Sequence, residues 1–233
     1  MKLGIIAAGE GSRLKEEGIS LPKPLVNVGG EPMIYRIIRN AKLNGFSSIN
    51  CIINEHSEPL RDYLTNNDFG IPINLVIQST QSSMHSLFVL APLLAGEKFC
   101  LTTADSIFDE KEFSDFITNA VNDLTVDGTL AITRFIDDEK PLCLKMDKTN
   151  RIIEFSDDKQ GFEWVTGGIY FFSPGIFKVM NQAIRSDISR LRNFLKLLIN
   201  NGYILKGYPF SKIIDVDHVS DIRQAEVFLN IQS

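Results

Sequence analysis

Residues 9–25 read GEGSRLKEEGISLPKPL, and they follow an apolar run, Leu3–Ala8, near the N-terminus. The segment combines glycines, which let backbone N–H groups approach a ligand closely, with the positive charges of Arg13, Lys15 and Lys23. Backbone donors and cations together suit a polyphosphate, whose oxygens carry negative charge. The chemistry that this part of the chain suggests is therefore the binding of phosphate groups.

The same segment has the length and the position of a functional loop. The apolar run before it is typical of a buried strand, and no helical pattern begins until Glu31, so we expect residues 9–30 to form one irregular loop. Loops of that length in a compact domain are usually functional or disordered. Ligands of open α/β sheets bind at the C-terminal ends of strands, which is where this loop starts.

The loop matches neither of two common phosphate-binding patterns. It contains no G-x-x-x-x-G-K-[ST] string, and Leu14 stands where the dinucleotide pattern G-x-G-x-x-G has its third glycine. Prolines fix the backbone on both sides of Lys23, which would help a lysine aimed at a phosphate and is not needed by a solvated one. A proline-stiffened surface loop with an incidental lysine is the alternative.

Composition limits the classes of partner. The net charge of −5 over 233 residues speaks against a broad nucleic-acid interface, although it allows a local basic pocket. No apolar run reaches the ~18 residues of a membrane span, and the N-terminus lacks the features of a signal peptide. We therefore expect a cytoplasmic protein without nucleic-acid or membrane partners. Cys51, Cys100 and Cys143 lie in strand-like runs without metal-ligand spacing, and we expect buried reduced thiols.

Strand and helix patterns alternate over the first hundred residues. We expect strands at Leu3–Ala7, Ile49–Ile53, Ile73–Ile77 and Phe99–Thr103. We expect helices between them at Pro32–Leu43, Glu58–Asn66 and Ser83–Leu94. This alternation indicates βαβ units and hence a mostly parallel sheet with right-handed crossovers.

The second half of the chain has a different succession of helices and strands. A helix is expected at Glu110–Asn122, and strands then follow one another with only loops between them, at Thr129–Thr133, Leu142–Met146, Arg151–Phe155 and Gly168–Phe172. This favours antiparallel or mixed pairing. A helix at Ile188–Ile199, a strand at Tyr203–Gly207 and a helix at Val219–Leu229 close the chain. We expect one α/β domain over 1–233, with an NTP-binding half (1–108) and an acceptor-binding half (109–233).

Three strings resemble the signature of the nucleotidyltransferases that activate sugar 1-phosphates and phosphocholine: AGEGSRL at 8–14, PKPL at 22–25 and VGGEPMI at 28–34. The resemblance implies a Rossmann-like three-layer sandwich with a mixed, mostly parallel central sheet. It implies a catalytic role for Lys23, which would stabilise charge on the reacting phosphates in the transition state. It also implies that the NTP is held by Ala8, Gly9, Gly11, Ser12 and Arg13, the last of these also catalytic.

Nucleotidyl transfer between anions usually needs Mg²⁺, which takes one or two carboxylates together with phosphate oxygens. Asp105 follows the expected strand Phe99–Thr103, where the family places a metal-binding and catalytic acid, although a turn or helix-capping role is the alternative. Asp215 and Asp217 would share one side of an extended segment and could complete the site, and we favour Asp217. We expect Asp221 to cap the last helix.

The resemblance is less sharp for the base and the acceptor. It implies that Gln78 reads the nucleobase and that Glu154 and Gly168 contact the acceptor. A bulge is the alternative explanation for Gly168. The residues around Glu154 depart from the family pattern, and the helix start at Ser86-Leu87 is similar to the phosphocholine branch. Trp164 could stack on a sugar or a choline cation, or simply pack in the fold.

The reaction implied is Mg²⁺-dependent transfer of a nucleotidyl group from an NTP to a sugar 1-phosphate, with release of pyrophosphate. Phosphocholine is the alternative acceptor. The alternative of another class is a non-catalytic nucleotide-sugar-binding protein, but such a protein would not need Lys23 or Asp105. A homo-oligomer is possible in either case. Because the sequence ends at Ser233, we expect no hexapeptide-repeat acetyltransferase domain like that of bifunctional relatives.

Overall fold

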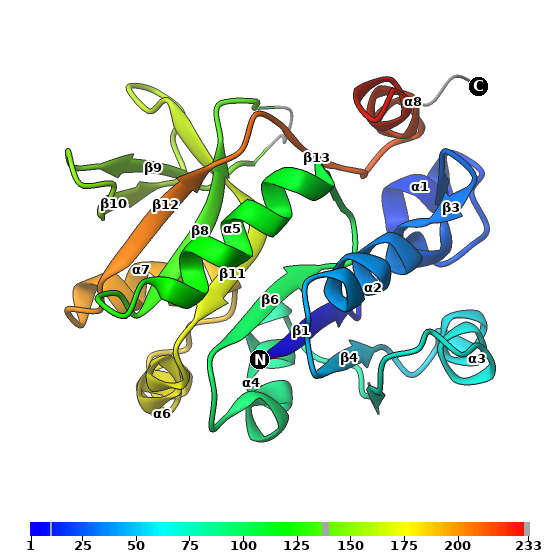
Figure 1. Ribbon diagram of the computed structural model, residues 1–233, viewed down its shortest axis with the longest axis horizontal. Helices are drawn as coiled ribbons and strands as arrows, with labels where there is room; N and C mark the ends of the chain where they lie inside the picture. Colours follow the sequence, from blue (N-terminus) through cyan, green and yellow to red (C-terminus); the bar gives the residue numbers. More distant parts are fainter. Residues whose placement is uncertain (10, 137–139, 231–233) are drawn as a thin grey trace.

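The computed structural model describes residues 1–9, 11–136 and 140–230. Within them a nine-stranded sheet has the order β10-β9-β11-β6-β1-β4-β5, and β8 pairs with both β11 and β12 (Figure 1). Its strands are β1 Lys2–Ala7, β4 Ser48–Ile53, β5 Ile73–Ile77, β6 Phe99–Thr103, β8 Gly128–Thr133, β9 Cys143–Met146, β10 Ile152–Ser156, β11 Trp164–Phe172 and β12 Leu205–Pro209. The helices are α1 Ser12–Glu16, α2 Met33–Leu43, α3 Glu58–Asn66, α4 Ser83–Leu94, α5 Glu110–Asn122, α6 Met180–Arg185, α7 Leu191–Asn200 and α8 Val219–Phe228, with 3₁₀ turns η1 Lys23–Leu25 and η2 Pro174–Val179.

The direction of the strands changes between the two halves of the sheet. β1 is parallel to β4 and β6, and β4 is parallel to β5. β11 is antiparallel to β6, β8 and β9, whereas β12 is parallel to β8. The predicted parallel pairing in the first half and the predicted mixed pairing in the second are confirmed, and β6 and β11 are the strands at which the two halves join.

Helices cover both faces of this sheet. One core contains Leu3 and Ile5 of β1 together with the apolar faces of α2, α3 and α5. The second core contains Ile6 of β1 with side chains of α4, α6 and α7. Neighbouring residues of β1 enter different cores because successive side chains of a strand point to opposite faces. The result is the predicted three-layer sandwich.

The expectation that residues 9–30 form one irregular loop is wrong. This stretch contains α1, η1 and the strand β2 (Asn27–Val28), and β2 pairs with β3 (Glu31–Pro32). Leu14 and Val28 are buried in a third, small core with Val216 and Ala225 from the end of the chain. Because these short elements depend on partners far along the chain, a local sequence pattern does not indicate them.

The end of the chain returns to the N-terminal loop. The strand β13 (Ile213–Asp215) pairs antiparallel with β7 (Ser106–Phe108) in a separate two-stranded ribbon. α8 follows and lies beside α1, as the red and blue helices of Figure 1 show. This return brings residues near 217 to the ends of β1 and β6.

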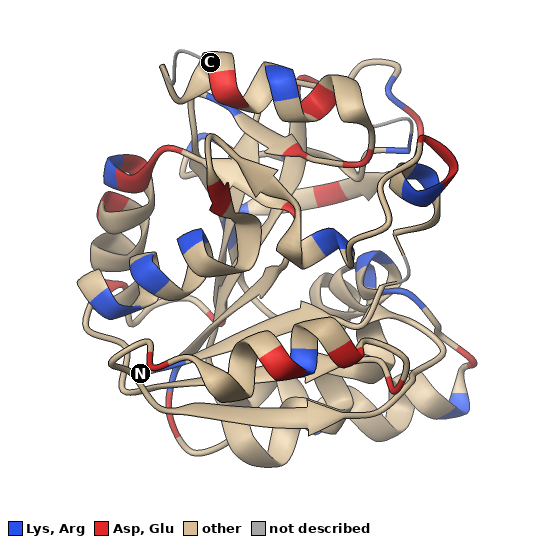
Figure 2. Cartoon of the chain, turned by 90° about the vertical axis from the view of Figure 1, so that its right-hand side faces the viewer, with Lys and Arg blue, Asp and Glu red and all other residues tan. Residues whose placement is uncertain are grey.

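Two further expectations can be compared with the fold. Cys51, Cys100 and Cys143 are buried free thiols, as predicted, and burial raises the pKa of Cys51 to about 12. Among the helices of the described residues, none has the length and apolarity needed to cross a membrane. In the view of Figure 2, basic and acidic positions are both spread over the helices and loops.

Candidate active site

Lys23 connects two carboxylates that come from distant parts of the chain. Its Nζ lies 2.6 Å from Oδ2 of Asp105 and 2.6 Å from Oδ1 of Asp217. Only 12% of the Lys23 side chain is exposed, and burial alone would lower its pKa. The two carboxylates outweigh burial and raise the pKa of Lys23 above its ordinary value, so the ammonium is charged at neutral pH.

Asp105 is held in its ionised form by the same contact. Its burial would raise the pKa, but the charge of Lys23 and hydrogen bonds from Lys23 and Thr103 lower the pKa below the ordinary value. Asp105 lies two residues after the end of β6 at Thr103, so the parallel sheet brings this carboxylate to the edge where β1 also ends. The strand pattern predicted this position.

Asp217 reaches the site through the ribbon formed by β7 and β13. Asp215 is opposite Ser106 in this ribbon, and the N–H of Val216 donates to the carbonyl oxygen of Asp105 at 3.1 Å. The backbone N–H of Asp217 donates to the Asp221 carboxylate at 2.9 Å. Asp221 also accepts from the N–H of His218 in the capping box of α8, so its predicted capping role is confirmed.

The backbone around Lys23 is constrained by its neighbours. Pro22 and Pro24 flank it, and Lys23 begins the 3₁₀ turn η1. Gly11 has φ of +60°, and a Cβ at Gly11 would lie 2.9 Å from the Cβ of Lys23. Both its conformation and this close approach require glycine, which gives Gly11 a structural reason beyond ligand binding.

The N-terminal loop is fastened to the end of the chain by charged side chains. Arg13 forms an ion pair with Asp217. At the end of α1, Glu17 accepts from the backbone N–H of Val219 at 2.7 Å and lies 2.6 Å from Nδ1 of His218. His218 is the N-cap residue of α8, and its side chain contacts Glu17. These contacts hold the loop over the carboxylates.

A cavity of about 460 Å³, which we call the Gly9 cavity, opens beside Lys23 and Asp105. Ala8 and Gly9 line it, and a Cβ at Gly9 would meet no described atom within 4 Å. Ser12 lies outside its lining, at the exposed start of α1, and Glu10 is outside the described residues. The rest of the lining includes Asn54, Ser79, Thr80, Gln81, Ser82, Ser83, Ser86 and Thr103.

A second cavity of about 480 Å³, the Gly168 cavity, adjoins the first. The two share Gln81, Ser82, Ser83, Thr103 and Asp105. The Gly168 cavity is lined further by Leu142, Thr166, Gly168, Tyr170, Arg190, Leu191, Arg192 and Asp215. Two pockets therefore meet at the carboxylate that Lys23 contacts.

Gly168 and Asp215 are close together in this second cavity. The pairing of β11 with β8 shifts register between Thr166 and Tyr170, and Gly168 has φ of +74°, so the predicted alternative of a bulge is present. A Cβ at Gly168 would lie 2.7 Å from Oγ of Ser106 and 3.9 Å from Oδ1 of Asp215. Gly168 is thus required by the backbone and also lines the cavity.

Asp215 differs from Asp217 in its surroundings. Asp215 Oδ1 accepts a hydrogen bond from Ser106 at 2.8 Å, whereas Asp217 contacts Lys23 and Arg13. β13 ends at Asp215, and the N–H of Asp217 folds back to the carbonyl oxygen of Asp215 at 3.1 Å. The segment is therefore turned, not extended as expected, and the two side chains reach different partners.

Some predicted ligand residues are not brought to the cavities. Gln78 is exposed and lines neither cavity, whereas Gln81 lines both, although its position was not singled out from the sequence. Glu154 is exposed on the outer strand β10, where its carboxylate lies 3.2 Å from Nζ of Lys145. The structure offers no contact through which Gln78 or Glu154 would reach a ligand in these pockets.

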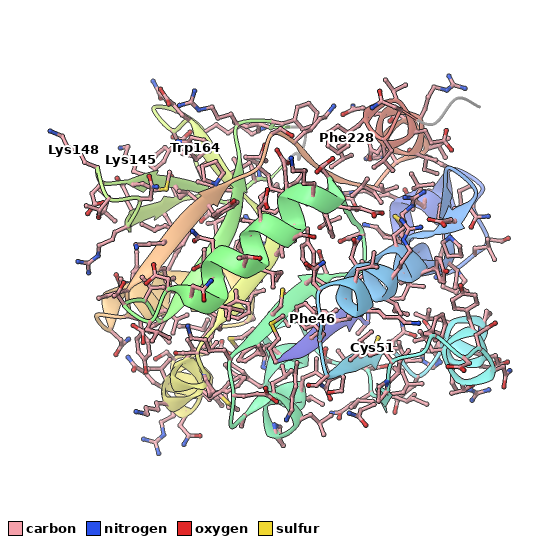
Figure 3. The ribbon with its side chains drawn as sticks, in the orientation of Figure 1. Phe46, Cys51, Lys145, Lys148, Trp164 and Phe228 are labelled. Atoms are coloured by element: carbon pink, nitrogen blue, oxygen red, sulfur yellow. The ribbon has the colours of Figure 1, made fainter. Side chains whose placement is uncertain are left out.

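Trp164 does not face either cavity. The guanidinium of Arg134 lies over its ring, 4.6 Å from the centroid, and Trp164 is at the same end of the molecule as Lys145 (Figure 3). The packing alternative for Trp164 is the one that the structure supports.

The carboxylates form a pair and not a larger cluster. In the part of the chain that the structure describes, no three His, Cys, Asp or Glu side chains are grouped so that they could hold a metal ion. Asp105, Asp215 and Asp217 are therefore not a three-carboxylate site. Asp105 and Asp217 still converge on one point, because a single ammonium contacts both.

Comparison with known families gives the same assignment as the site. A family model described as Nucleotidyl transferase matches residues 3–231. The chain belongs to the nucleotidyl transferase family. The glycine-rich loop and Lys23 of this nucleotidyl transferase are also the residues that carried the resemblance in its sequence.

Curated relatives and solved structures extend this comparison. The "Bifunctional protein GlmU" of Methanococcus maripaludis is 26% identical over 97% of the chain and 54% of its own length. The "Bifunctional IPC transferase and DIPP synthase" of Thermococcus kodakarensis is 32% identical over 50% of the chain and 25% of its own length. The inositol-1-phosphate CTP transferase from T. maritima superposes with a TM-score of 0.83 at 19% identity, covering 99% of this chain and 95% of that one, which shows a common fold.

The extent of these matches also has a limit. This nucleotidyl transferase spans about half the length of the GlmU proteins that it matches. Each of these names describes the protein that bears it.

Proposed function

We propose that this nucleotidyl transferase moves a nucleotidyl group from an NTP to a sugar 1-phosphate and releases pyrophosphate. The observation that carries the proposal is the position of Lys23. Its ammonium contacts Asp105 at the place where the Gly9 cavity and the Gly168 cavity meet. Two ligands bound in adjoining pockets would therefore present their reacting phosphates to the same pair of charged groups.

The Gly9 cavity suits the NTP. Its volume of about 460 Å³ lies in the range of small-molecule sites. Ala8 and Gly9 offer backbone without a large side chain, and Lys23 supplies positive charge from the lining. Arg13 lies outside this lining and is joined to Lys23 through Asp217. Gln81 has a donor and an acceptor on its side-chain amide, which makes it a better candidate than Gln78 for reading a base edge.

The reaction needs no nucleophilic side chain. A phosphate oxygen of the acceptor forms a new bond to the α-phosphorus, the bond from the α-phosphorus to the bridging oxygen breaks, and pyrophosphate leaves with that electron pair. Catalysis then consists of alignment and of neutralising charge on the phosphates, and Lys23 and Arg13 would do this from the N-terminal loop. Asp217, which lies between the β7–β13 ribbon and the cap of α8, holds Lys23 and Arg13 in position through its ion pairs.

The donor set fits Mg²⁺, which nucleotidyl transfer between anions usually needs. Asp105 and Asp217 are oxygen ligands that meet at one point, and a cation, the Lys23 ammonium, already satisfies both. Two carboxylates with remaining positions for phosphate oxygens are the donor set that Mg²⁺ prefers. When bound, the ion would neutralise the phosphate oxygens and help to align the reactants.

The Gly168 cavity suits a phosphorylated polyol more than phosphocholine. Arg190 lines this cavity, and its guanidinium is a suitable partner for an acceptor phosphate. A quaternary ammonium group is recognised by aromatic faces. Among the described lining residues Tyr170 alone is aromatic, and it is buried and stacked on Phe172.

A substrate panel tests this proposal. Four NTPs are crossed with hexose 1-phosphates, inositol 1-phosphate and phosphocholine, with and without Mg²⁺, and pyrophosphate release is measured. We expect release only with Mg²⁺, an NTP and a sugar-type acceptor, and its loss in Asp105→Asn. Asp62→Asn is the matched control, because Asp62 is an exposed carboxylate on α3 that pairs with its neighbour Arg61. No release with any pair would contradict the enzymatic reading and favour a binding protein.

A further inference from the structure

We propose that Glu17 is the residue that positions Arg13 for the phosphates of the NTP. The inference rests on the proposed function, because it assumes that Arg13 meets these phosphates. The motifs of the sequence do not single out Glu17, which lies between the glycine-rich string and the lysine string. In this role Glu17 acts on the substrate through another side chain and does not itself touch the NTP.

Arg13 and Glu17 lie on the same face of α1. They are four residues apart, and the N–H of Glu17 donates to the carbonyl oxygen of Arg13 at 3.1 Å. Side chains at this spacing are neighbours on a helix. Both side chains reach the segment that leads into α8, where Arg13 pairs with Asp217 and Glu17 contacts the two residues that follow. One face of α1 is therefore docked on the start of α8.

The contacts of Glu17 are with positively polarised groups. One of its carboxylate oxygens accepts from the N–H of Val219 at 2.7 Å, and the other lies 2.6 Å from Nδ1 of His218. Val219 is the first residue of α8, and the N–H groups at the start of a helix carry partial positive charge. Along α1 a cation is followed by an anion, and the facing segment presents Asp217 and then the start of α8. This opposite order of charges fixes the position of α1 along α8.

The backbone at Glu17 is fixed by the way in which α1 ends. Gly18 has φ of +92°, and its N–H donates to the carbonyl oxygen of Lys15 at 3.1 Å. The N–H of Ile19 donates to the carbonyl oxygen of Leu14 at 2.9 Å. This pair of hydrogen bonds around a left-handed glycine is the Schellman motif. The Glu17 carboxylate is thus attached to a defined turn and not to an irregular loop.

The two contacts of α1 differ in what an NTP would do to them. A triphosphate competes with Asp217 for Arg13, because both are anions that pair with a guanidinium. It does not compete for the partners of Glu17 in the same way, since one of these is a backbone N–H already satisfied by the carboxylate. Glu17 therefore keeps α1 docked while Arg13 changes partner. Without Glu17, ordering Arg13 on the triphosphate would weaken NTP binding.

Glu226 provides a matched control further along α8. Its Oε1 accepts from the backbone N–H of Gly29 at 3.0 Å, so this carboxylate also joins α8 to the N-terminal segment. The contact lies about two helical turns beyond Val219 and involves neither α1 nor Arg13. Loss of Glu226 loosens the attachment of α8 but leaves the face that holds Arg13. The two acids separate positioning of Arg13 from attachment in general.

The first test measures initial rates and melting temperatures of Glu17→Ala and Glu226→Ala with the best substrate pair from the panel. We expect Glu17→Ala to raise the KM of the NTP about tenfold, the low end of the range for a hydrogen bond to a charged group, and to leave the KM of the acceptor within about twofold of wild type. Glu226→Ala should lower the melting temperature but leave both KM values within about twofold. Glu17→Gln keeps an acceptor for the N–H of Val219 and should raise the NTP KM by only about three- to fivefold.

The second test is a double-mutant cycle between Glu17 and Arg13. In the background of Arg13→Ala, we expect Glu17→Ala to change the NTP KM by less than about twofold, because the side chain through which Glu17 acts is gone. A residue that only stabilises the fold would lower the melting temperature in both backgrounds without this difference in KM. The cycle therefore measures the path from Glu17 to the NTP.

Three results overturn the inference: an unchanged NTP KM in Glu17→Ala, an equal rise in Glu226→Ala, or effects of Glu17→Ala and Arg13→Ala that simply multiply. If Glu17→Ala does not fold, Glu17→Gln replaces it in each comparison. If the wild type shows no turnover, the proposed function fails, and calorimetric titration of inorganic tripolyphosphate with Mg²⁺ still decides. Weaker binding by Glu17→Ala, with Glu226→Ala equal to wild type, then supports the inference, and equal binding by wild type and Glu17→Ala, including none by either, overturns it.

Discussion

Replacing Lys23 with methionine removes the cation that joins Asp105 and Asp217 while keeping a side chain of similar length. The wild-type ammonium lies 2.6 Å from each carboxylate. Asp217 keeps its ion pair with Arg13, but Asp105 loses its cationic partner. The variant therefore tests both the catalytic and the structural role of one contact.

The size of both effects can be worked from the structure. Removal of one preorganised group that stabilises transition-state charge lowers kcat by about 10²- to 10³-fold. Breaking a buried ion pair costs about 3–5 kcal/mol, and we expect about 3 kcal/mol, the low end of this range. The low end applies because 26% of the Asp105 side chain is exposed. For a chain of this size the melting temperature should fall by about 6–12 °C.

The stability difference should depend on pH with a defined sign. In the wild type, Lys23 lowers the pKa of Asp105 below its ordinary value, so the contribution to stability is present above the ordinary value and is lost as pH falls through the lowered pKa. In Lys23→Met, burial acts without this opposition and raises the pKa of Asp105. Ionising the carboxylate then destabilises the variant. The gap in melting temperature between wild type and variant should widen from about pH 4.5 to about pH 7.5.

Thermal melts at both pH values and initial rates of pyrophosphate release provide the assay. Lys111→Met is the matched control, because Lys111 is an exposed lysine of α5. A Lys23→Met enzyme with more than a tenth of the wild-type kcat would refute the catalytic argument. A melting-temperature gap that stays constant with pH would refute the electrostatic argument.

Four further substitutions test the loop and the acceptor site. Gly11→Ala should destabilise the fold by about 1–3 kcal/mol in urea unfolding, because φ is +60° and the new Cβ would crowd the neighbouring lysine, whereas Gly9→Ala should leave unfolding unchanged and raise the NTP KM. Arg190→Gln should raise the acceptor KM about tenfold without changing the NTP KM, as measured by initial rates. Glu17→Gln removes the contact that raises the pKa of His218. The contribution of this contact to folding stability is full below the ordinary histidine pKa and is lost as pH rises through the raised pKa. The melting-temperature difference from wild type should therefore be larger near pH 6 than near pH 9.

The regular elements could be predicted from the sequence because their apolar patterns are local. The bounds of α4 and β6, Ser83–Leu94 and Phe99–Thr103, agree with the patterns that predicted them. The turn η2 and helix α6, over 174–185, were not predicted, because this stretch has no sustained period of apolar residues. The short elements of the N-terminal loop were missed for another reason, since the core that buries Leu14 includes Ile214, Val216 and Ala225 from the far end of the chain.

The site shows the same division between local and distant information. Asp105 could be placed because an acid directly after a buried strand has a defined position at the sheet edge. The surroundings of Asp215 and Asp217 could not, because the turn after β13 sends neighbouring acids to different partners. Glu154 was assigned by its place in a motif, but β10 is the edge strand of the sheet, where Glu154 contacts Lys145. The roles of the site residues remain predictions that the experiments above address.

The charge balance of the site connects its two binding events. Arg13 and Lys23 neutralise Asp217, and Lys23 also neutralises Asp105, so two cations are matched by two carboxylates. Lys23 and Arg13 can serve an incoming triphosphate fully only if they weaken these contacts. Asp105 and Asp217 would then be left close together without their cations, which is costly for partly buried carboxylates. A divalent cation that arrives with the phosphates removes this cost, because it satisfies the carboxylates that Lys23 and Arg13 release. Binding of the NTP and binding of the cation should therefore strengthen each other, and the same ion pairs that stabilise the free protein make neither ligand bind well alone.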